Sequence, residues 1–134
     1  MKDITSRQDI AALMQKFYIN VLANQEIGKF FSESVKNWDH HLARFTDYWE
    51  SNVLFSESYE GSPLKRHIEI DRRYDHSFVP GHFDLWVELF ERTTDEMFAG
   101  EKAELAKEVA RNMSRNIHNQ MFIGRKPEKH TFNH

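Results

Sequence analysis

The chain has 134 residues, enough for one domain with a hydrophobic core of its own. Its formal net charge of −3, with both signs mixed, gives little attraction for nucleic acid, whose binding proteins concentrate positive charge. The absence of cysteine excludes disulfides, iron–sulfur clusters and thiolate zinc sites. No segment approaches the roughly 18 apolar residues of a membrane span. Residues 1–6 lack the basic and apolar regions of a secretory signal, so we expect a cytoplasmic protein.

Aromatic side chains are unusually frequent, with 11 Phe, 4 Tyr and 3 Trp, and they are accompanied by 8 His. Such a composition is typical of a dense core. It is equally typical of a pocket for a large, flat, apolar ligand, and composition alone does not choose between the two.

The first two predicted helices begin at polar caps. Thr5 or Ser6 is expected to cap the first, with Asp9 three residues after Ser6 in an arrangement like a capping box. Residues 24–28 interrupt the helical period, and Asn37 is expected to cap the second helix. The apolar stripes of these two helices hold Ile10, Leu13, Met14, Phe17 and Val21, with Tyr18 beside them, and then Trp38, Leu42, Phe45, Trp49 and Val53.

Proline and glycine mark the remaining elements. Ser62 and Pro63 predict the start of a short helix, whereas residues 69–79 lack a clean period and are expected to form a loop. Pro80 predicts a further helix that Gly100 ends, and a last helix is expected to end near Gly124. Without strand-like alternation, we expect an all-α domain over residues 1–124 and a polar, mobile tail over residues 125–134.

The histidines limit the kinds of metal site. His40 and His41 are adjacent and point about 100° apart on a helix, so both cannot face the core, and His41 is the one turned toward the apolar side. A partly buried histidine bonded to a carbonyl is the simpler interpretation of His41, and a surface histidine that of His67. The lack of a Glu-x-x-His pair excludes a di-iron carboxylate bundle. Haem stays possible, because one histidine suffices when the pocket is apolar and aromatic.

Four short motifs follow the pair Phe17-Tyr18 along the chain. The motifs are Ile27–Phe31, Trp38–Leu42 with Tyr48-Trp49-Glu50 after it, Tyr59–His67 and His82–Phe90. Each motif alone is weak, but four in order are a strong signal. From Asp3 to about Ile123 the sequence resembles the group III truncated haemoglobins, and the paired glycines of the other two truncated groups are missing.

The resemblance implies a shortened globin fold around haem b. In that family His67 matches the proximal iron ligand, Tyr18 and Trp86 the distal hydrogen-bond donors, and His41 the histidine over the distal side. Trp86 follows His67 by 19 positions, which is long for the family, so the packing of residues 69–79 stays open and His76 remains a minor rival ligand. Phe31, Phe45 and Trp49 match family positions that line the haem ring. Arg44 matches a position where a basic residue often meets a haem propionate.

The function implied by the resemblance is reversible binding of O₂, or of NO or CO, at the haem. Two alternatives stay open. The first is a haem enzyme with peroxidase-like or NO-detoxifying chemistry, which uses the distal donors and needs an external electron donor such as a reductase. The second is a helical sensor or interaction module that has lost the haem and kept the aromatic core.

Overall fold

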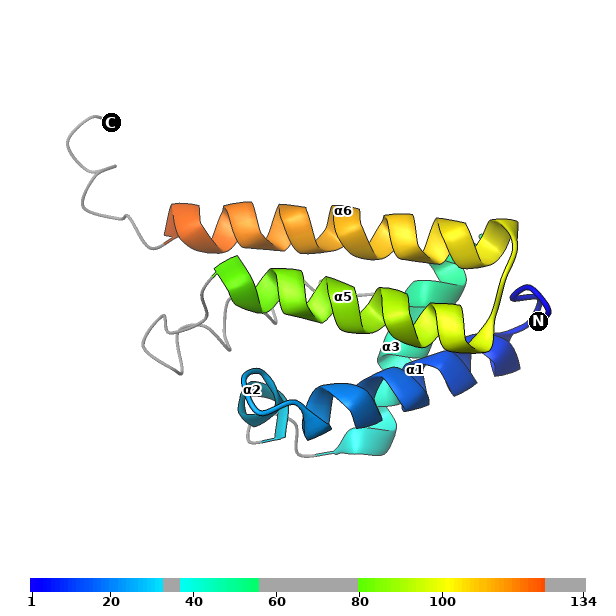
Figure 1. Cartoon of the computed structure of the whole chain (residues 1–134), viewed down its shortest axis with the longest axis horizontal. Coiled ribbons are helices and arrows are strands. Elements are labelled where there is room, and N and C mark those ends of the chain that lie inside the picture. The colour runs from blue at the N-terminus through cyan, green and yellow to red at the C-terminus, as the bar shows by residue number, and fades with distance from the viewer. Residues whose placement is uncertain (33–36, 56–79, 125–134) are drawn as a thin grey trace.

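A computed structural model describes residues 1–32, 37–55 and 80–124 of the chain (Figure 1). These residues contain helices and no strand, which confirms the predicted all-α class. The helices are α1 (Arg7–Ala23), α2 (Gly28–Ser32), α3 (Trp38–Val53), α5 (Pro80–Met97) and α6 (Glu101–Gly124). The short helix expected at His67, the loop at residues 69–79 and the tail at residues 125–134 lie outside the described residues.

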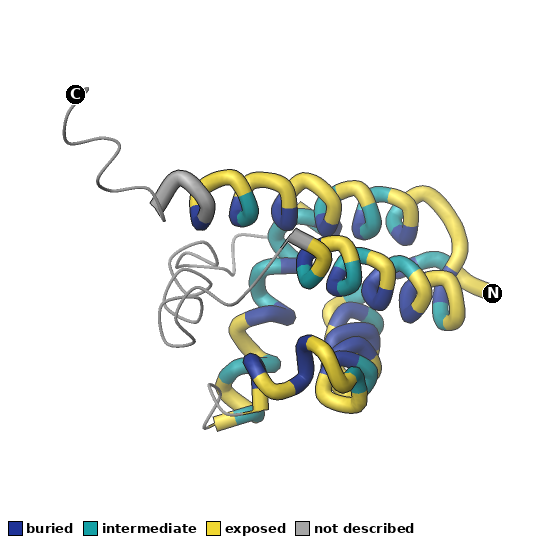
Figure 2. The backbone as a smooth tube through the Cα atoms, turned by 60° about the vertical axis from the view of Figure 1, so that its left-hand side comes forward, coloured by how far each residue is buried: buried dark blue, intermediate teal, exposed yellow. Residues whose placement is uncertain are grey.

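The long helices form two crossing layers. The helices α5 and α6 run antiparallel beside each other, and α1 lies along the other side of α5 (Figure 1). The helix α3 crosses behind this layer and contacts both α1 and α6. Buried residues line the inward faces of all four helices (Figure 2). Within the described ranges, no helix has the length and apolar character needed to cross a membrane.

Local capping confirms two of the predicted helix starts. The Ser6 hydroxyl accepts a hydrogen bond from the Asp9 backbone N–H at 3.2 Å, and the Asn37 side chain accepts one from the His40 N–H at 3.1 Å. The Asp9 carboxylate reaches back to the Thr5 N–H at 2.9 Å, one residue earlier than a capping box requires. The bond from the Lys2 ammonium, followed by the bond from Thr5, lowers the pKa of Asp9 to about 2.

Asp3 holds the N-terminal segment against the start of α6. Its carboxylate accepts hydrogen bonds from the Lys102 and Ala103 backbone N–H groups, both at 2.9 Å, and from the Ile4 N–H at 2.8 Å. Burial raises the pKa of Asp3, but these backbone bonds outweigh burial and the net pKa is lowered. Asp3 therefore satisfies two of the N–H groups that a helix start leaves unpaired.

Gly100 has a different role from the one that the sequence indicates. We expected it to end the helix before it, but α5 ends three residues earlier at Met97. Gly100 has a φ of +137° directly before α6, and an added Cβ would lie 2.5 Å from the Asp3 Cγ. The positive φ, together with the close approach of the Asp3 carboxylate, favours glycine here.

We predict that Asp3→Asn lowers the free energy of unfolding at pH 7 by about 1 kcal/mol, because the amide keeps one acceptor oxygen but loses the charge and the second acceptor. Because the folded-state pKa of Asp3 lies below its value of 3.8 in an unfolded chain, the carboxylate stabilises the fold above that value. This stabilisation is lost as the pH falls through the folded-state pKa.

Urea denaturation at neutral and acidic pH checks this prediction. The difference in the free energy of unfolding between Asp3→Asn and the unmodified protein should be smaller at acidic pH. Asp84→Asn, at an exposed position of α5, is the matched control and should cost little at either pH. An equal loss at both pH values for Asp3→Asn would contradict the role of the charge.

Candidate functional site

Tyr18 lies at the crossing of α1 and α3 and is surrounded by aromatic rings. Its own side chain is 2% exposed. The ring centroids of Phe45 and His41 lie 5.1 and 5.3 Å from that of Tyr18, and those of Trp38 and Phe31 at 6.0 and 6.1 Å. Spacings of three and four residues place Trp38, His41 and Phe45 on one face of α3. The fold therefore brings together four residues that the sequence predicted for a site: Tyr18, Phe31, His41 and Phe45.

His41 forms the outer side of this group of rings. Its side chain is half-buried, with the Nε2 atom buried, whereas His40 is exposed. The His41 ring contacts Phe45 at 4.5 Å and Trp38 at 5.2 Å between centroids, in addition to Tyr18. The prediction that only His41 of the adjacent pair faces the core is confirmed.

Trp86 belongs to a neighbouring group of rings at the contact of α1 and α5. It is 4% exposed, and its ring lies edge-on to Phe17 at 5.1 Å and nearly parallel to Phe90 at 6.0 Å. Trp49 of α3 stacks on Phe90 at 4.6 Å. Phe17 also contacts Tyr18 at 4.9 Å, so the two groups of rings are joined through Phe17.

Three polar atoms in these rings are buried without an acceptor. Among the described residues, the Tyr18 hydroxyl, the Trp86 Nε1 and the Trp49 Nε1 have no hydrogen-bond partner. Burial raises the pKa of Tyr18 well above its usual value, so the hydroxyl keeps its proton at neutral pH. An indole N–H can only donate. This arrangement can therefore bind a group that accepts hydrogen bonds.

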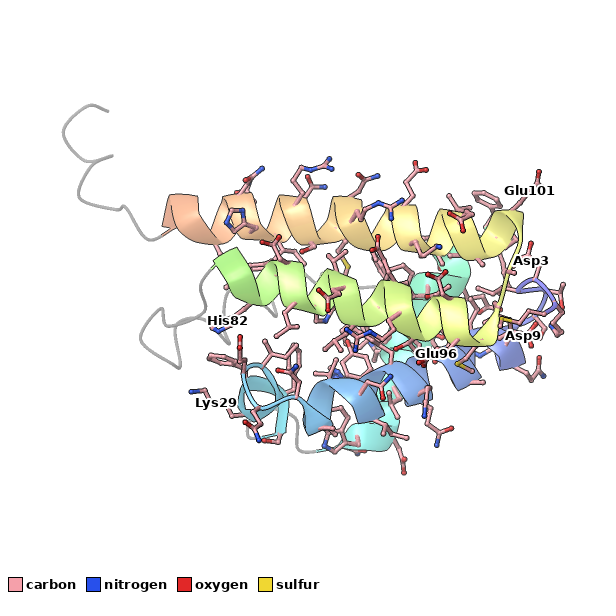
Figure 3. All side chains as sticks on the ribbon, viewed as in Figure 1. Asp3, Asp9, Lys29, His82, Glu96 and Glu101 are labelled. Carbon is pink, nitrogen blue, oxygen red and sulfur yellow. The ribbon has the colours of Figure 1, made fainter. Side chains whose placement is uncertain are left out.

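His82 connects the start of α5 to α2. Its ring lies 5.2 Å from that of Phe30, and it faces the region of Lys29 (Figure 3). Burial lowers the pKa of His82, and the nearby Lys29 lowers it further, while Glu26 acts in the opposite direction. A neutral His82 ring thus packs on α2, the helix that supplies Phe31 to the rings around Tyr18.

The remaining predicted site residues lie elsewhere. Arg44 is exposed on α3, and His67 and His76 lie outside the described residues. In the described part of the chain, no three His, Asp or Glu side chains cluster as metal ligands would. The sequence analysis did not assign Trp38, Phe17 or Phe90 to the site. Trp38 and Phe90 lie three and four residues from His41 and Trp86, and this helical spacing is the signal that indicates them. Phe17 has no such signal, because it is adjacent to Tyr18 and residues one position apart do not face each other on a helix.

A separate groove of about 610 Å³ runs between α5 and α6. Its α5 side is acidic and its α6 side is basic, and Arg111 and Glu91 pair across it. The charged walls make it unsuitable for a large apolar ligand. The lining residues are Phe83, Asp84, Val87, Glu88, Glu91, Arg111, Ser114, Arg115 and His118.

Comparison with known proteins identifies one type of relative. No protein-family model matches the chain. The Group 3 truncated hemoglobin ctb of Campylobacter jejuni is 24% identical over 121 residues, which cover 87% of this chain and 91% of that protein. A crystal structure of the group III truncated hemoglobin from Campylobacter jejuni superimposes with a TM-score of 0.79 and 25% identity. That superposition covers 90% of this chain and 95% of the other.

We predict that Tyr18→Phe stabilises the protein when no ligand is present. A buried hydroxyl without an acceptor costs about 1–3 kcal/mol, so its removal should raise the free energy of unfolding by up to that amount. Urea denaturation of the ligand-free protein measures the change. Tyr48→Phe, at a half-buried position of α3, is the control and should give no gain. A loss of stability in Tyr18→Phe would mean that the hydroxyl has a partner.

Proposed function

Because this chain has the truncated globin fold and resembles a group III truncated haemoglobin over most of its length, we propose that it binds haem and, at the haem, a small diatomic ligand such as O₂, NO or CO. Haem iron supplies the chemistry that takes such a ligand. One observation carries the proposal: the Tyr18 hydroxyl and the Trp86 Nε1 are buried donors without an acceptor among the described residues. The absence of cysteine favours haem b, which is held without thioether bonds.

The described residues fit a flat, apolar group that carries an acceptor at its centre. Phe31, Phe45 and Trp49 are all nine-tenths or more buried and supply the apolar aromatic surface that such a group needs. They would exclude water from the ring. Arg44, exposed on α3, would meet a propionate at the edge, because a guanidinium matches the geometry of a carboxylate.

His67 is the proposed iron ligand. A neutral imidazole is the ordinary protein ligand of haem iron in globins. The assignment rests on the motif Tyr59–His67 alone, since these residues lie outside the described ones. His67 would hold the iron, and Tyr18 and Trp86 would donate hydrogen bonds to the ligand bound there.

Tyr18 and Trp86 would select the ligand. Both would donate to an acceptor, and burial keeps the Tyr18 hydroxyl protonated. Two donors in a dry pocket favour a ligand that accepts hydrogen bonds or carries negative charge, because hydrogen bonds strengthen in a low dielectric. His41, half-buried beside Tyr18, would stand between this pocket and solvent and limit the access of ligands.

We predict that His67→Gly abolishes stable haem retention. The loss of the axial bond leaves only the contacts with the aromatic rings and with Arg44, so the purified variant should lack Soret absorption. Added imidazole should restore it, because the free base can occupy the space of the missing side chain. His76→Gly is the matched control and should keep its haem. Normal haem content in His67→Gly, or its loss in His76→Gly, would refute the assignment.

We also predict that Tyr18→Phe and Trp86→Phe each raise the rate of O₂ dissociation, by about tenfold for the loss of one hydrogen bond of about 1.4 kcal/mol. Stopped-flow displacement of O₂ by CO measures this rate. Tyr48→Phe serves as control and should match the unmodified protein. If neither variant changes the rate, the two residues are core residues only.

A further inference from the structure

Phe17 lies between Tyr18 and Trp86, the two proposed hydrogen-bond donors. It is fully buried and contacts Tyr18 of its own helix and Trp86 of α5, with centroid distances of 4.9 and 5.1 Å. Its ring stands at 87° to the Trp86 indole, the edge-to-face geometry that aromatic pairs prefer. The Phe17 ring also lies edge-on to the Phe90 ring, with 5.1 Å between their centroids. The Phe90 ring is itself nearly parallel to the Trp86 indole.

The two donors differ in how firmly the described residues hold them. Tyr18 has five aromatic or histidine rings within about 6 Å, from α1, α2 and α3. For Trp86, the ring contacts with described residues are those with Phe17 and Phe90. Without Phe17, Trp86 loses its edge-to-face partner, whereas Tyr18 keeps its ring contacts with α2 and α3. The Trp86 indole is therefore the group that depends on Phe17.

A hydrogen bond joins α1 to α5 near this contact, three residues after Phe17 on α1 and seven after Trp86 on α5. The Asn20 side-chain amide donates a hydrogen bond to the Thr93 hydroxyl at 2.9 Å, and Thr93 in turn donates to the Leu89 carbonyl at 2.7 Å. Thr93 is fully buried, so the bond is shielded from water. The Asn20–Thr93 bond helps to hold α1 against α5, where Phe17 contacts Trp86.

From this geometry we propose that Phe17 is a positioning residue that orients the Trp86 indole, so that its N–H and the Tyr18 hydroxyl donate to the same bound ligand. Phe17 does not touch the ligand itself and acts through the orientation of Trp86. This inference rests on the proposed haem function and assigns part of its ligand control to a residue of the apolar core.

The test is Phe17→Leu, which keeps most of the volume and removes the ring. The C–O stretching band of the carbon monoxide complex, measured by infrared spectroscopy, reports hydrogen bonding to the ligand independently of any turnover. We expect the band to shift or split in Phe17→Leu. We also expect the rate of CO dissociation to change by about 2- to 10-fold, the range expected for one aromatic pair.

The variant Trp86→Phe serves as a second background, in which an effect of Phe17 on the orientation of the indole can be told from its effect on core packing. Trp86→Phe keeps a ring at this position but removes the N–H. In that background Phe17→Leu should still lower stability but should leave the C–O band unchanged. Phe98→Leu is the matched control, since Phe98 is buried just after the end of α5, against Lys2, and it should lower stability without a spectral shift.

Three results would overturn the inference. They are an unchanged band in Phe17→Leu, an equal shift in the Trp86→Phe background, and a shift of the same size in Phe98→Leu. Phe17→Met, a flexible apolar replacement, is held to the same criteria if Phe17→Leu does not fold. If the unmodified protein takes up no haem, the proposed function itself fails and the inference falls with it. If haem is bound but the band does not depend on Trp86, the inference alone fails.

Discussion

A buried hydrogen-bond donor without an acceptor lowers the stability of a folded protein, and this constraint underlies the interpretation of the structure. Among the described residues, Tyr18, Trp49 and Trp86 each keep such a donor in the core. Each costs about 1–3 kcal/mol, against a total stability of about 5–15 kcal/mol for a typical domain. A core built only for packing would use phenylalanine at these positions. In the proposed function, a bound group would supply the acceptor for Tyr18 and Trp86.

The fold holds these donors by contacts that lie away from them. The Arg7 guanidinium pairs with Asp47 and Glu50 at 2.7 Å and ties the start of α1 to α3. The Asn20–Thr93 bond fixes α1 against α5, and Asp3 fixes the N-terminal segment against α6. The Arg7 ion pairs are partly exposed and individually weak. Together with the hydrogen bonds of Asn20 and Asp3, they add to the core packing that holds the helices in place. Rings held at a fixed crossing can orient a donor before the ligand arrives, which lowers the cost of binding.

The sequence predicted the features that depend on neighbouring residues. The caps at Ser6 and Asn37 and the start at Pro80 are local signals, and the 3.6-residue period identified the buried faces. The resemblance to group III truncated haemoglobins, carried by short motifs in order, is confirmed by the comparisons. Contacts between distant residues could not be predicted. The Asp3 bonds span 99 and 100 positions, and they bring the Asp3 carboxylate close to Gly100.

The site was predicted less completely than the fold, for the same reason. The motifs indicated Tyr18, His41 and Trp86, but the role of Phe17 depends on a crossing angle that no local pattern records. The proposed haem site is tested most directly by adding hemin to the haem-free protein and following its absorption. We expect saturation at one hemin per chain, with a sharp Soret band that shifts on reduction under CO. A protein that is colourless when purified and leaves the spectrum of free hemin unchanged would contradict the account.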